Sequence, residues 1–222
     1  CTKTAKDIIH SGRIGTLMAM TGQWTVRKDS QYYEPHWRRQ IEAGPILTNL
    51  IHEIDLLRFI CGDIVTVSAE VTNHDQQFSK EDAVAITMKF ANNAIGSFVL
   101  SDRTPTPWNW EMALGENAKF PKSEQNAIRF MGTKGSLEFP NLVLWSHSNA
   151  DGNWQDKIFR EEIETPFVDA YVAQCQHLCA VVRGTQRPII GAENGTKSLE
   201  VTLAVIRAAN EGNRIIIDRL LK

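Results

Sequence analysis

The sequence predicts an α+β fold in which a large, mostly antiparallel, open β-sheet carries helices on one of its faces. Short runs rich in β-branched and aromatic residues follow one another between residues 64 and 163, and compact turns separate them. Short connections favour antiparallel pairs, because parallel neighbours need a longer crossover. Segments with helical periodicity stand before, within and after this region. Together these observations indicate a sheet layer packed against a helix layer.

The composition is that of an ordinary globular domain. The 222 residues are 42% hydrophobic, and no repeat or flexible linker divides them, so we expect one domain over residues 1–222. The net charge is -2 and the basic residues are scattered, which argues against the basic stripe that nucleic acids require. No apolar run approaches the ~20 residues of a membrane span and no signal peptide is recognisable, so a cytoplasmic location is expected.

The cysteines indicate neither a disulfide framework nor a metal site. Their density is far below that of secreted disulfide-rich domains, so we expect reduced thiols; the four are Cys1, Cys61, Cys175 and Cys179. Cys175, His177 and Cys179 are close in sequence, but on a helix the two cysteines share a face that His177 does not. No second ligand pair follows, so we interpret these residues as packed core and expect no metal.

The first forty residues predict a helix, a strand and an aromatic loop. Residues 2–11 have a helical apolar pattern that ends at Ser11-Gly12. Residues 13–27 alternate loosely, which predicts a long strand with a bulge near Gly22. Residues 28–39 lead directly into the next helix, so their side chains should lie near its N-terminal end. They include Tyr32, Tyr33, Trp37, Arg38 and Arg39.

Residues 44–62 predict an amphipathic helix around which the fold is organised. Gly44-Pro45 and Gly62 stand where helix ends favour proline and glycine. The apolar residues that recur at helical spacing are Ile46, Leu47, Leu50, Ile51, Ile54 and Leu57. A second row follows the edge of this stripe at steps of four, three and four residues: Thr48, His52, Asp55 and Phe59. An imidazole one turn from a carboxylate makes this row the leading candidate for chemistry.

Strand patterns fill the middle of the chain. They cover residues 64–72, 83–90, 94–100, 127–131, 136–139, 142–145 and 157–163. Asn92-Asn93 predicts a hairpin turn between the second and third strands, since asparagine tolerates positive φ. The stretch 101–110 holds two prolines and two tryptophans. It predicts a loop that lines either a pocket or a subunit interface.

Two helices and a short strand are predicted at the C-terminal end. Residues 168–183 and 192–210 have helical periodicity, the turn between them contains Pro188, and residues 214–218 can close the sheet as a strand. Seven or eight strands then form the sheet, with the helices on one face. If the face of the sheet without helices is apolar, another protein surface should bury it, because large exposed apolar patches are uncommon on monomers. We therefore expect a homo-oligomer that forms through the sheet.

Nucleotide-binding and hydrolase motifs are missing from the sequence. It contains no G-x-G-x-x-G after a strand, no P-loop and no G-x-S-x-G elbow. Gly132-Thr133-Lys134-Gly135 stands between two short strand patterns rather than before a helix, so a hairpin is expected there instead of a phosphate cradle. The chain itself encodes no nucleotide site.

Five segments stand in an order that is far more specific than any one motif. They are Ser-Gly-Arg-Ile-Gly at 11–15, the helix start at 44–55, the hairpin that ends at Ser101-Asp102, and residues 132–137 and 195–201. This order resembles the C-terminal domain of the Gfo/Idh/MocA oxidoreductases, the glucose–fructose oxidoreductase and inositol dehydrogenase group. The resemblance implies an N-terminal Rossmann domain, absent from this chain, that holds NAD or NADP and supplies a lysine. The α+β domain would bind a small hydroxylated substrate and mediate oligomerisation.

The resemblance also places site residues on the predicted central helix. The family pattern G-G-x-x-x-D-x-G-x-H-x-x-D puts its histidine on His52 and its last aspartate on Asp55. Thr48 stands where the first aspartate is usual, and Leu50 stands where glycine is usual. In the family these acidic and imidazole groups contact the substrate beside the nicotinamide.

We hypothesise that His52 orients the reacting hydroxyl of a sugar, polyol or cyclitol and shares proton transfer with the lysine of the absent domain. Neutral imidazole suits this role because its ordinary pKa of ~6.5 lies near working pH. Asp55 or Asn49 would fix the imidazole tautomer, and Asp55 is also expected near the substrate. The residues expected to bind neighbouring substrate hydroxyls are Asn49, Thr48, Trp37 and Arg38.

Two function classes remain open on the sequence. The first is the substrate-binding and oligomerisation domain of an NAD(P)-dependent dehydrogenase, inactive without its cofactor domain. The second is a non-catalytic binding or assembly module that dimerises through the same sheet. Thr48 keeps the second class open, because a threonine hydroxyl cannot act as an ionised base.

Overall fold

A nine-stranded sheet forms the centre of the computed structural model, which describes residues 1–74, 78–115, 120–149, 152–166 and 168–217. The strand order is β8-β7-β6-β5-β1-β4-β3-β2-β9. The strands are β1 (Leu17–Thr25), β2 (Ile64–Thr72), β3 (Ala83–Phe90), β4 (Ile95–Ser101), β5 (Ile128–Gly132), β6 (Gly135–Phe139), β7 (Val143–His147), β8 (Ile158–Glu162) and β9 (Ile215–Ile216). Each predicted strand segment is present, so the sheet has nine strands rather than the seven or eight expected. The large, mostly antiparallel open sheet of an α+β fold is confirmed.

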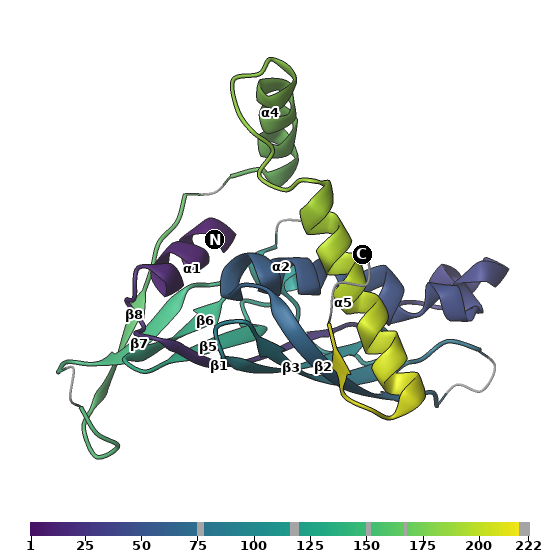
Figure 1. The fold of residues 1–222 in the computed structure, drawn as a ribbon, viewed down its shortest axis with the longest axis horizontal. Coiled ribbons are helices and arrows are strands. Elements are labelled where there is room, and N and C mark those ends of the chain that lie inside the picture. The colour runs from purple at the N-terminus through teal and green to yellow at the C-terminus, as the bar shows by residue number, and fades with distance from the viewer. Residues whose placement is uncertain (75–77, 116–119, 150–151, 167, 218–222) are drawn as a thin grey trace.

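Three helices cover one face of this sheet (Figure 1). The α-helices are α1 (Thr2–His10), α2 (Ile51–Cys61), α3 (Trp110–Leu114), α4 (Ala170–Val182) and α5 (Ala192–Glu211). Short 3₁₀ turns η1 (Gln31–Tyr33), η2 (His36–Arg39) and η3 (Ile41–Ala43) occupy the predicted aromatic loop and the residues after it. In Figure 1, α1, α2 and α5 cover the sheet from above, while α4 stands apart from it. Among the described helices, none has the length and apolar character that a membrane crossing needs.

One pair of neighbouring strands departs from the predicted antiparallel pattern. β1 and β4 lie side by side in the middle of the sheet and run parallel, with Thr25 opposite Ser101 at their ends. The other strand pairs among the described residues are antiparallel. Because parallel strands end at the same edge, the chain after Thr25 and the chain after Ser101 leave the sheet side by side. This edge carries the candidate site.

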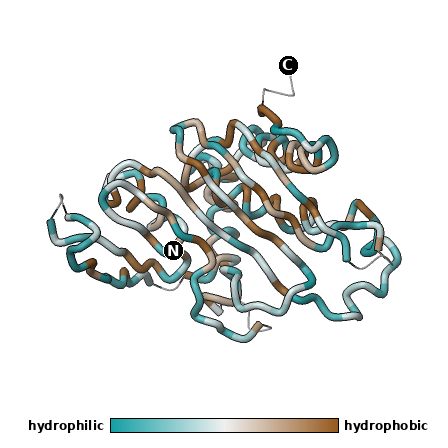
Figure 2. The backbone as a smooth tube through the Cα atoms, turned by 90° about the horizontal axis from the view of Figure 1, so that it is seen from below, coloured by the Kyte–Doolittle hydropathy of each residue, from teal (hydrophilic) through white to brown (hydrophobic). Residues whose placement is uncertain are grey.

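The alternation of side chains separates a core face from an open face. Residues of β4 alternate between exposed and buried positions, with Phe98 and Leu100 on the buried face and Ser97 and Val99 on the exposed face. Seen from the side opposite the helices, the tube in Figure 2 shows apolar and polar residues mixed along the central strands. The helix layer therefore covers one face, and side chains of the other face remain accessible.

The predicted bulge in β1 lies elsewhere. The register between β1 and β5 shifts between Leu17 and Ala19 rather than near Gly22. Gly22 has a different role: a Cβ at this position would lie 2.8 Å from ring atoms of Phe98 on the neighbouring strand. The glycine signal in the sequence thus marks a close packing contact instead of an extra residue.

The central helix begins with an irregular turn that periodicity did not predict. Residues Ile46–Leu50 form a π-helical turn, η4, which continues into α2 and ends at Gly62 with φ of 97°. The carboxylate of Glu81 reaches this start, where its Oε1 accepts a hydrogen bond of 2.8 Å from the Ile46 N–H. Gly44 leaves space for that carboxylate, since a Cβ there would lie 2.2 Å from Glu81 Oε2. The turn before β3 thereby fixes the start of the helix.

A fully buried ion pair ties the same turn to the end of β4. Lys80 Nζ donates to both carboxylate oxygens of Asp102, at 2.9 and 3.0 Å, and both side chains are 0% exposed. The backbone carbonyl of Asp102 accepts hydrogen bonds from the Tyr33 hydroxyl at 3.2 Å and from the Lys28 N–H at 3.0 Å. Asp102 therefore joins three segments that are distant in sequence.

The cysteines of α4 contradict the predicted core position. Cys175 and Cys179 are exposed in the structure, whereas Cys61 on α2 is buried. In the described residues no group of three or more His, Cys, Asp or Glu side chains is arranged to hold a metal ion. The apolar pattern of α4 is that of a packed helix, but no residue of α4 is buried by the rest of this chain.

Replacing Lys80 with methionine is expected to lower the free energy of unfolding by about 3–5 kcal/mol, because it leaves the Asp102 carboxylate buried without its closest cation. Urea denaturation followed by tryptophan fluorescence measures the change. Arg13→Met is the control, since it removes an exposed pair with Glu161 and should cost at most about 1 kcal/mol. Equal effects of the two substitutions would contradict the role given to the buried pair.

Candidate functional site

A cavity of about 380 Å³ opens where β1 and β4 end. Its walls come from the end of β1 and the segment after it, from η1, from η4 and from α3 with the residue before it. The lining residues are Trp24, Val26, Arg27, Lys28, Asp29, Tyr32, Asn49, Asn109, Glu111, Met112 and Phe120. Such a mixture of apolar and aromatic walls with a few converging polar groups is typical of a small-molecule site.

Lys28 is one of two cationic residues that line this cavity, the other being Arg27. Lys28 stands three residues after β1, its side chain is 14% exposed, and its Nζ donates to Asn49 Oδ1 at 2.9 Å and to the Tyr32 hydroxyl at 3.3 Å. The same nitrogen lies 3.6 Å from Asp102 Oδ2. The buried carboxylate that binds Lys80 therefore also holds Lys28 in place. The lining of the cavity thus places the Lys28 ammonium and Arg27 beside two carboxylates, Asp29 and Glu111.

Thr48 and Asn49 present their side chains from the π-helical turn. Thr48 Oγ1 lies 3.0 Å from both the Gly44 carbonyl oxygen and Asn49 Oδ1. Asn49 Oδ1 thus accepts from Lys28 and faces the Thr48 hydroxyl. Within the described contacts this leaves the Asn49 amide Nδ2 as the atom that can donate to a bound molecule. The structure brings these two predicted residues together with a lysine that was not predicted.

Aromatic rings form the other walls of the cavity. Lys28 Nζ lies 4.4 Å from the ring centroid of Tyr32 and 5.9 Å from that of Trp24. Phe120 lines the cavity and is 42% exposed. Flat, partly polar rings beside hydrogen-bond donors suit a ligand with C–H faces and hydroxyl edges. Cation–π contacts also hold the ammonium between the two rings.

Trp37 and Arg38 lie beside the cavity and not among its lining residues. Trp37 is 57% exposed, and the Arg38 guanidinium stacks 4.3 Å from the ring centroid of Tyr32. Arg38 Nη1 donates to the Tyr32 carbonyl oxygen at 2.9 Å. In this chain, then, Arg38 supports Tyr32 from behind.

His52 and Asp55 point to different partners. The His52 side chain is exposed and follows Asn49 by one helical turn. Asp55 Oδ1 accepts a hydrogen bond of 2.8 Å from Ser198 Oγ on α5, so this carboxylate joins α2 to α5. Asp55 also lines a separate small cavity of about 180 Å³ beside Arg58. The predicted His–Asp row is therefore split between an exposed imidazole and a carboxylate that holds two helices together.

Glu53, the residue after His52, is a buried carboxyl group behind the cavity wall. It is 2% exposed, its Oε1 accepts a hydrogen bond of 3.0 Å from Trp110 Nε1, and its Oε2 has no hydrogen-bond partner among the described atoms. Burial raises the pKa of Glu53 to about 8; the Trp110 hydrogen bond opposes this rise and the nearby Glu111 charge adds to it. Trp110 opens α3, whose N-cap Asn109 accepts from the Met112 N–H at 2.9 Å. Glu53 thereby anchors the helix that closes one side of the cavity.

The sequence did not single out Lys28, Trp24 or Asn109. Their convergence depends on the parallel pairing of β1 with β4, which short connections do not reveal. One local signal was present for Asn109, because asparagine followed by a short helical run is a typical N-cap. No comparable local signal marks Lys28 or Trp24.

A sequence comparison identifies the family. The model of the GFO/IDH/MocA C-terminal domain matches residues 2–138, more than half of the chain. The chain belongs to the GFO/IDH/MocA family. This result confirms the resemblance drawn from the ordered segments.

Relatives in the GFO/IDH/MocA family include named sugar and inositol enzymes. The chain is 25% identical to 1,5-anhydro-D-fructose reductase of Ensifer adhaerens over 231 residues, which cover 97% of this chain and 60% of the relative. It is 24% identical to scyllo-inositol 2-dehydrogenase (NAD(+)) of Bacillus subtilis over 184 residues, which cover 79% and 48% of the two proteins.

A solved structure shares the fold of this GFO/IDH/MocA chain. The WlbA dehydrogenase of Bordetella pertussis, described in complex with NADH and UDP-GlcNAcA, superposes with a TM-score of 0.68. It is 20% identical, and the match covers 96% of this chain and 58% of WlbA. The chain thus spans no more than about 60% of these relatives' lengths.

Glu53 gives a pH-dependent stability. Its pKa is raised in the folded state, from 4.5 to about 8, so the folded chain binds this proton more tightly than the unfolded chain does. Its contribution is fully favourable below pH 4.5 and is lost as the pH rises through about 8. Glu53→Gln should remove this loss and raise the free energy of unfolding at pH 9 by a few kcal/mol, with roughly 5 kcal/mol as the ceiling.

The measurement is urea unfolding of both proteins at pH 5 and pH 9. Glu161→Gln is the control, because Glu161 is exposed on β8 and its substitution should leave the pH dependence unchanged. If Glu53→Gln and the parent chain lose the same stability between the two pH values, the assignment of a neutral buried carboxyl is wrong.

Proposed function

We propose that this chain is the substrate-binding domain of an NAD(P)-dependent oxidoreductase that acts on a secondary hydroxyl of a sugar, polyol or cyclitol. A dinucleotide-binding domain would precede it, and residues 1–222 would form one domain of the larger protein. The cavity at the ends of the parallel strands β1 and β4 carries the proposal, because it joins hydrogen-bond donors to aromatic walls in a member of this family. The sugar and inositol relatives support this choice of substrate class.

The proposed roles follow from the geometry of the cavity. Lys28 Nζ and Asn49 Nδ2 donate to substrate oxygens, and Thr48 fixes the Asn49 amide. Trp24 and Tyr32 pack against the C–H face of the substrate. Trp37 lies beside the cavity with an exposed indole that a larger ligand can contact, and Arg38 holds Tyr32 in place from behind.

His52 is the proposed proton acceptor. Oxidation of a secondary alcohol removes a hydride from carbon and a proton from oxygen, and a nicotinamide bound by the preceding domain would supply the hydride acceptor. The exposed imidazole of His52, one turn after Asn49, takes the hydroxyl proton. Asp55 is bonded to Ser198, so we assign it the positioning of α2 rather than of the imidazole.

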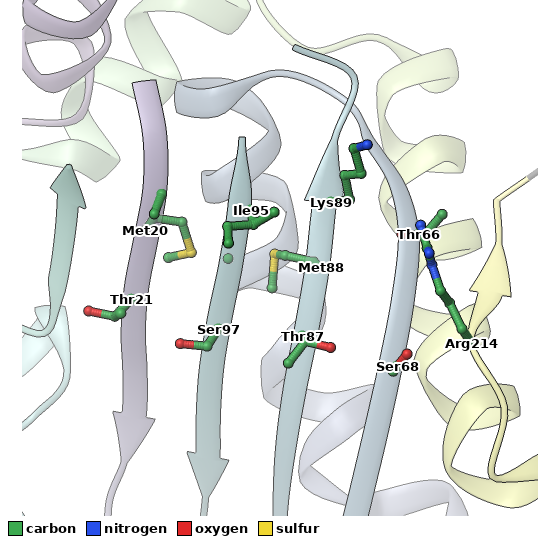
Figure 3. Close-up of a pocket in the computed structure, with 12 residues that line it drawn as sticks. Met20, Thr21, Thr66, Ser68, Thr87, Met88, Lys89, Ile95, Ser97 and Arg214 are labelled. Carbon is green, nitrogen blue, oxygen red and sulfur yellow. The ribbon is translucent and has the colours of Figure 1, made fainter. Parts of the chain in front are cut away.

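Self-association through the open face of the sheet is a second part of the proposal. Strand pairing places Thr21 opposite Ser97, Ser97 opposite Thr87 and Thr87 opposite Ser68. Figure 3 shows this row of small hydroxyl side chains in a groove that crosses four strands. Small side chains let another sheet approach closely.

Apolar residues on β4 flank the row of hydroxyls. Ile95 is 59% exposed and Val99 is 45% exposed, on either side of Ser97. Large side chains of this type on a sheet face favour association with another sheet over exposure to water. A second copy of the chain on this face would cover both.

The catalytic proposal predicts the behaviour of two variants of the whole protein. The parent should bind NADH or NADPH and oxidise at least one member of a panel of sugars and cyclitols. His52→Ala should lower turnover by ~10²–10⁴, as expected for a positioned acid–base group. Lys28→Met should lower kcat/KM by roughly 10–100-fold, because a charge-assisted hydrogen bond to substrate is worth about 1.5–3 kcal/mol.

Residues outside the cavity supply the controls for these kinetics: His147 is half-buried and Lys157 is exposed. His147→Ala on β7 and Lys157→Met beside β8 should leave both parameters within a few-fold of the parent. A parent protein that binds no nicotinamide cofactor refutes the oxidoreductase proposal. A His52→Ala variant with near-parental turnover removes His52 from the mechanism.

The association proposal predicts that the double substitution Ile95→Asp and Val99→Asp converts an oligomer into a smaller species without loss of secondary structure. Sedimentation velocity of the parent and the variant measures the masses. Leu199→Asp and Leu203→Asp on α5 give a control with similar exposure, and this pair should keep the parental mass. An unchanged mass for the β4 variant would assign assembly to another surface.

A further inference from the structure

Helix α4 has an unusual surface for a helix in water. None of its 13 residues is charged and none is buried. Tyr171 is 82% exposed, Leu178 is 61% exposed and Val182 is 79% exposed. A helix that has no charged residue and a broad apolar stripe is normally covered by protein on that stripe. The described residues leave the side chains of α4 accessible to solvent.

The contacts of α4 come from its own flanking segments. Asp169 caps its N-terminus by accepting from the Tyr171 and Val172 N–H groups. His177 bonds to the returning chain, where its Nε2 accepts from the Ile189 N–H at 3.2 Å and its Nδ1 lies 2.9 Å from Gln186 Oε1. These bonds give α4 and its return segment a fixed shape without help from the sheet. Figure 1 shows the resulting unit standing off the body of the fold.

We propose that α4 is the docking element for the dinucleotide-binding domain that precedes this one, a proposal that rests on the function proposed above. The GFO/IDH/MocA model that matches this chain describes a C-terminal domain, and the relatives contain about 40% of their length beyond the match. The first residue of this chain lies at α1, on the same side of the sheet as α4 (Figure 1). A domain joined before α1 therefore emerges in the space beside α4.

The strongly exposed apolar side chains of α4 lie on one broad stripe. At about 100° per residue, Tyr171, Leu178 and Val182 fall within about 40° of one another, and Val172 widens the stripe to about 120°. A groove in a neighbouring domain can cover a stripe of this width. The first residue of the chain lies on the same side of the sheet as α4 (Figure 1), which favours the preceding domain over a second copy as the occupant. At roughly 20 Å the helix is long enough to span such a groove.

Two thiols report directly on this contact. Cys175 and Cys179 stand one turn apart on α4 and are exposed, while Cys61 is 3% exposed in the core. Native alkylation of the whole protein with N-ethylmaleimide, read by peptide mass spectrometry, gives the rate at each cysteine. We expect Cys175 and Cys179 to react at least 10-fold more slowly in the native protein than in urea.

Leu178→Asp is the variant that tests docking. Leu178 is exposed in this chain, so the substitution should leave the sheet domain folded and disturb only what covers α4. Alkylation of Cys175 and Cys179 should accelerate at least 10-fold, while Cys61 stays protected. Leu203→Asp on α5 is the matched control and should change none of these rates.

Two results overturn the proposal. The first is full reactivity of Cys175 and Cys179 in the native parent protein. The second is protection that disappears on dilution, because it assigns the contact to another copy of the chain. NADH binding to the same samples separates this proposal from the function it rests on. If the protein binds NADH and its α4 thiols react freely, only the docking proposal is refuted. If the thiols are protected and the protein binds no NADH, only the oxidoreductase function is refuted.

Discussion

The buried carboxylate of Asp102 is the constraint on which the candidate site depends. It holds Lys80 at 2.9 Å inside the protein and Lys28 at 3.6 Å at the cavity wall, while its backbone carbonyl receives the Tyr33 hydroxyl. A charge in this position is costly unless it is paired, so the segments that supply the cations have to converge on it. The turn before β3 and the segment after β1 are fixed relative to each other in this way.

The position of Asp102 follows from the sheet. β1 and β4 run parallel in the centre, so the segments that contain Lys28 and Asp102 leave the same edge. Sites of α/β proteins lie at comparable strand ends, where adjacent chains separate and leave a crevice. In this chain the crevice is closed by η4 on one side and by α3 on the other. Glu53 links those two walls through Trp110.

Much of the fold was predictable because local sequence patterns determine many of its helices, strands and turns. The alternation in residues 83–90 and the asparagines of the following turn predicted a hairpin that is present, with Asn93 at φ of 70°. The parallel pairing and the π-helical turn were not predictable, since both are set by tertiary contacts such as that of Glu81 with the Ile46 N–H. For the cavity, the sequence singled out Asn49, which lines it, and Thr48, which contacts Asn49, but not Lys28; the roles of Thr48 and Asn49 in binding stay predictions. It grouped His52 with Asp55, whose partner Ser198 is 143 residues away.

A crystal structure of the whole protein with NADH and a substrate that it turns over tests the central claim most directly. The claim is that the cavity at the ends of β1 and β4 binds the hydroxylated substrate. It predicts substrate oxygens within about 3 Å of Lys28 Nζ and Asn49 Nδ2, with the reacting hydroxyl toward His52. Substrate bound in the groove of the open sheet face, or anywhere that leaves Lys28 and Asn49 without contact, would contradict it.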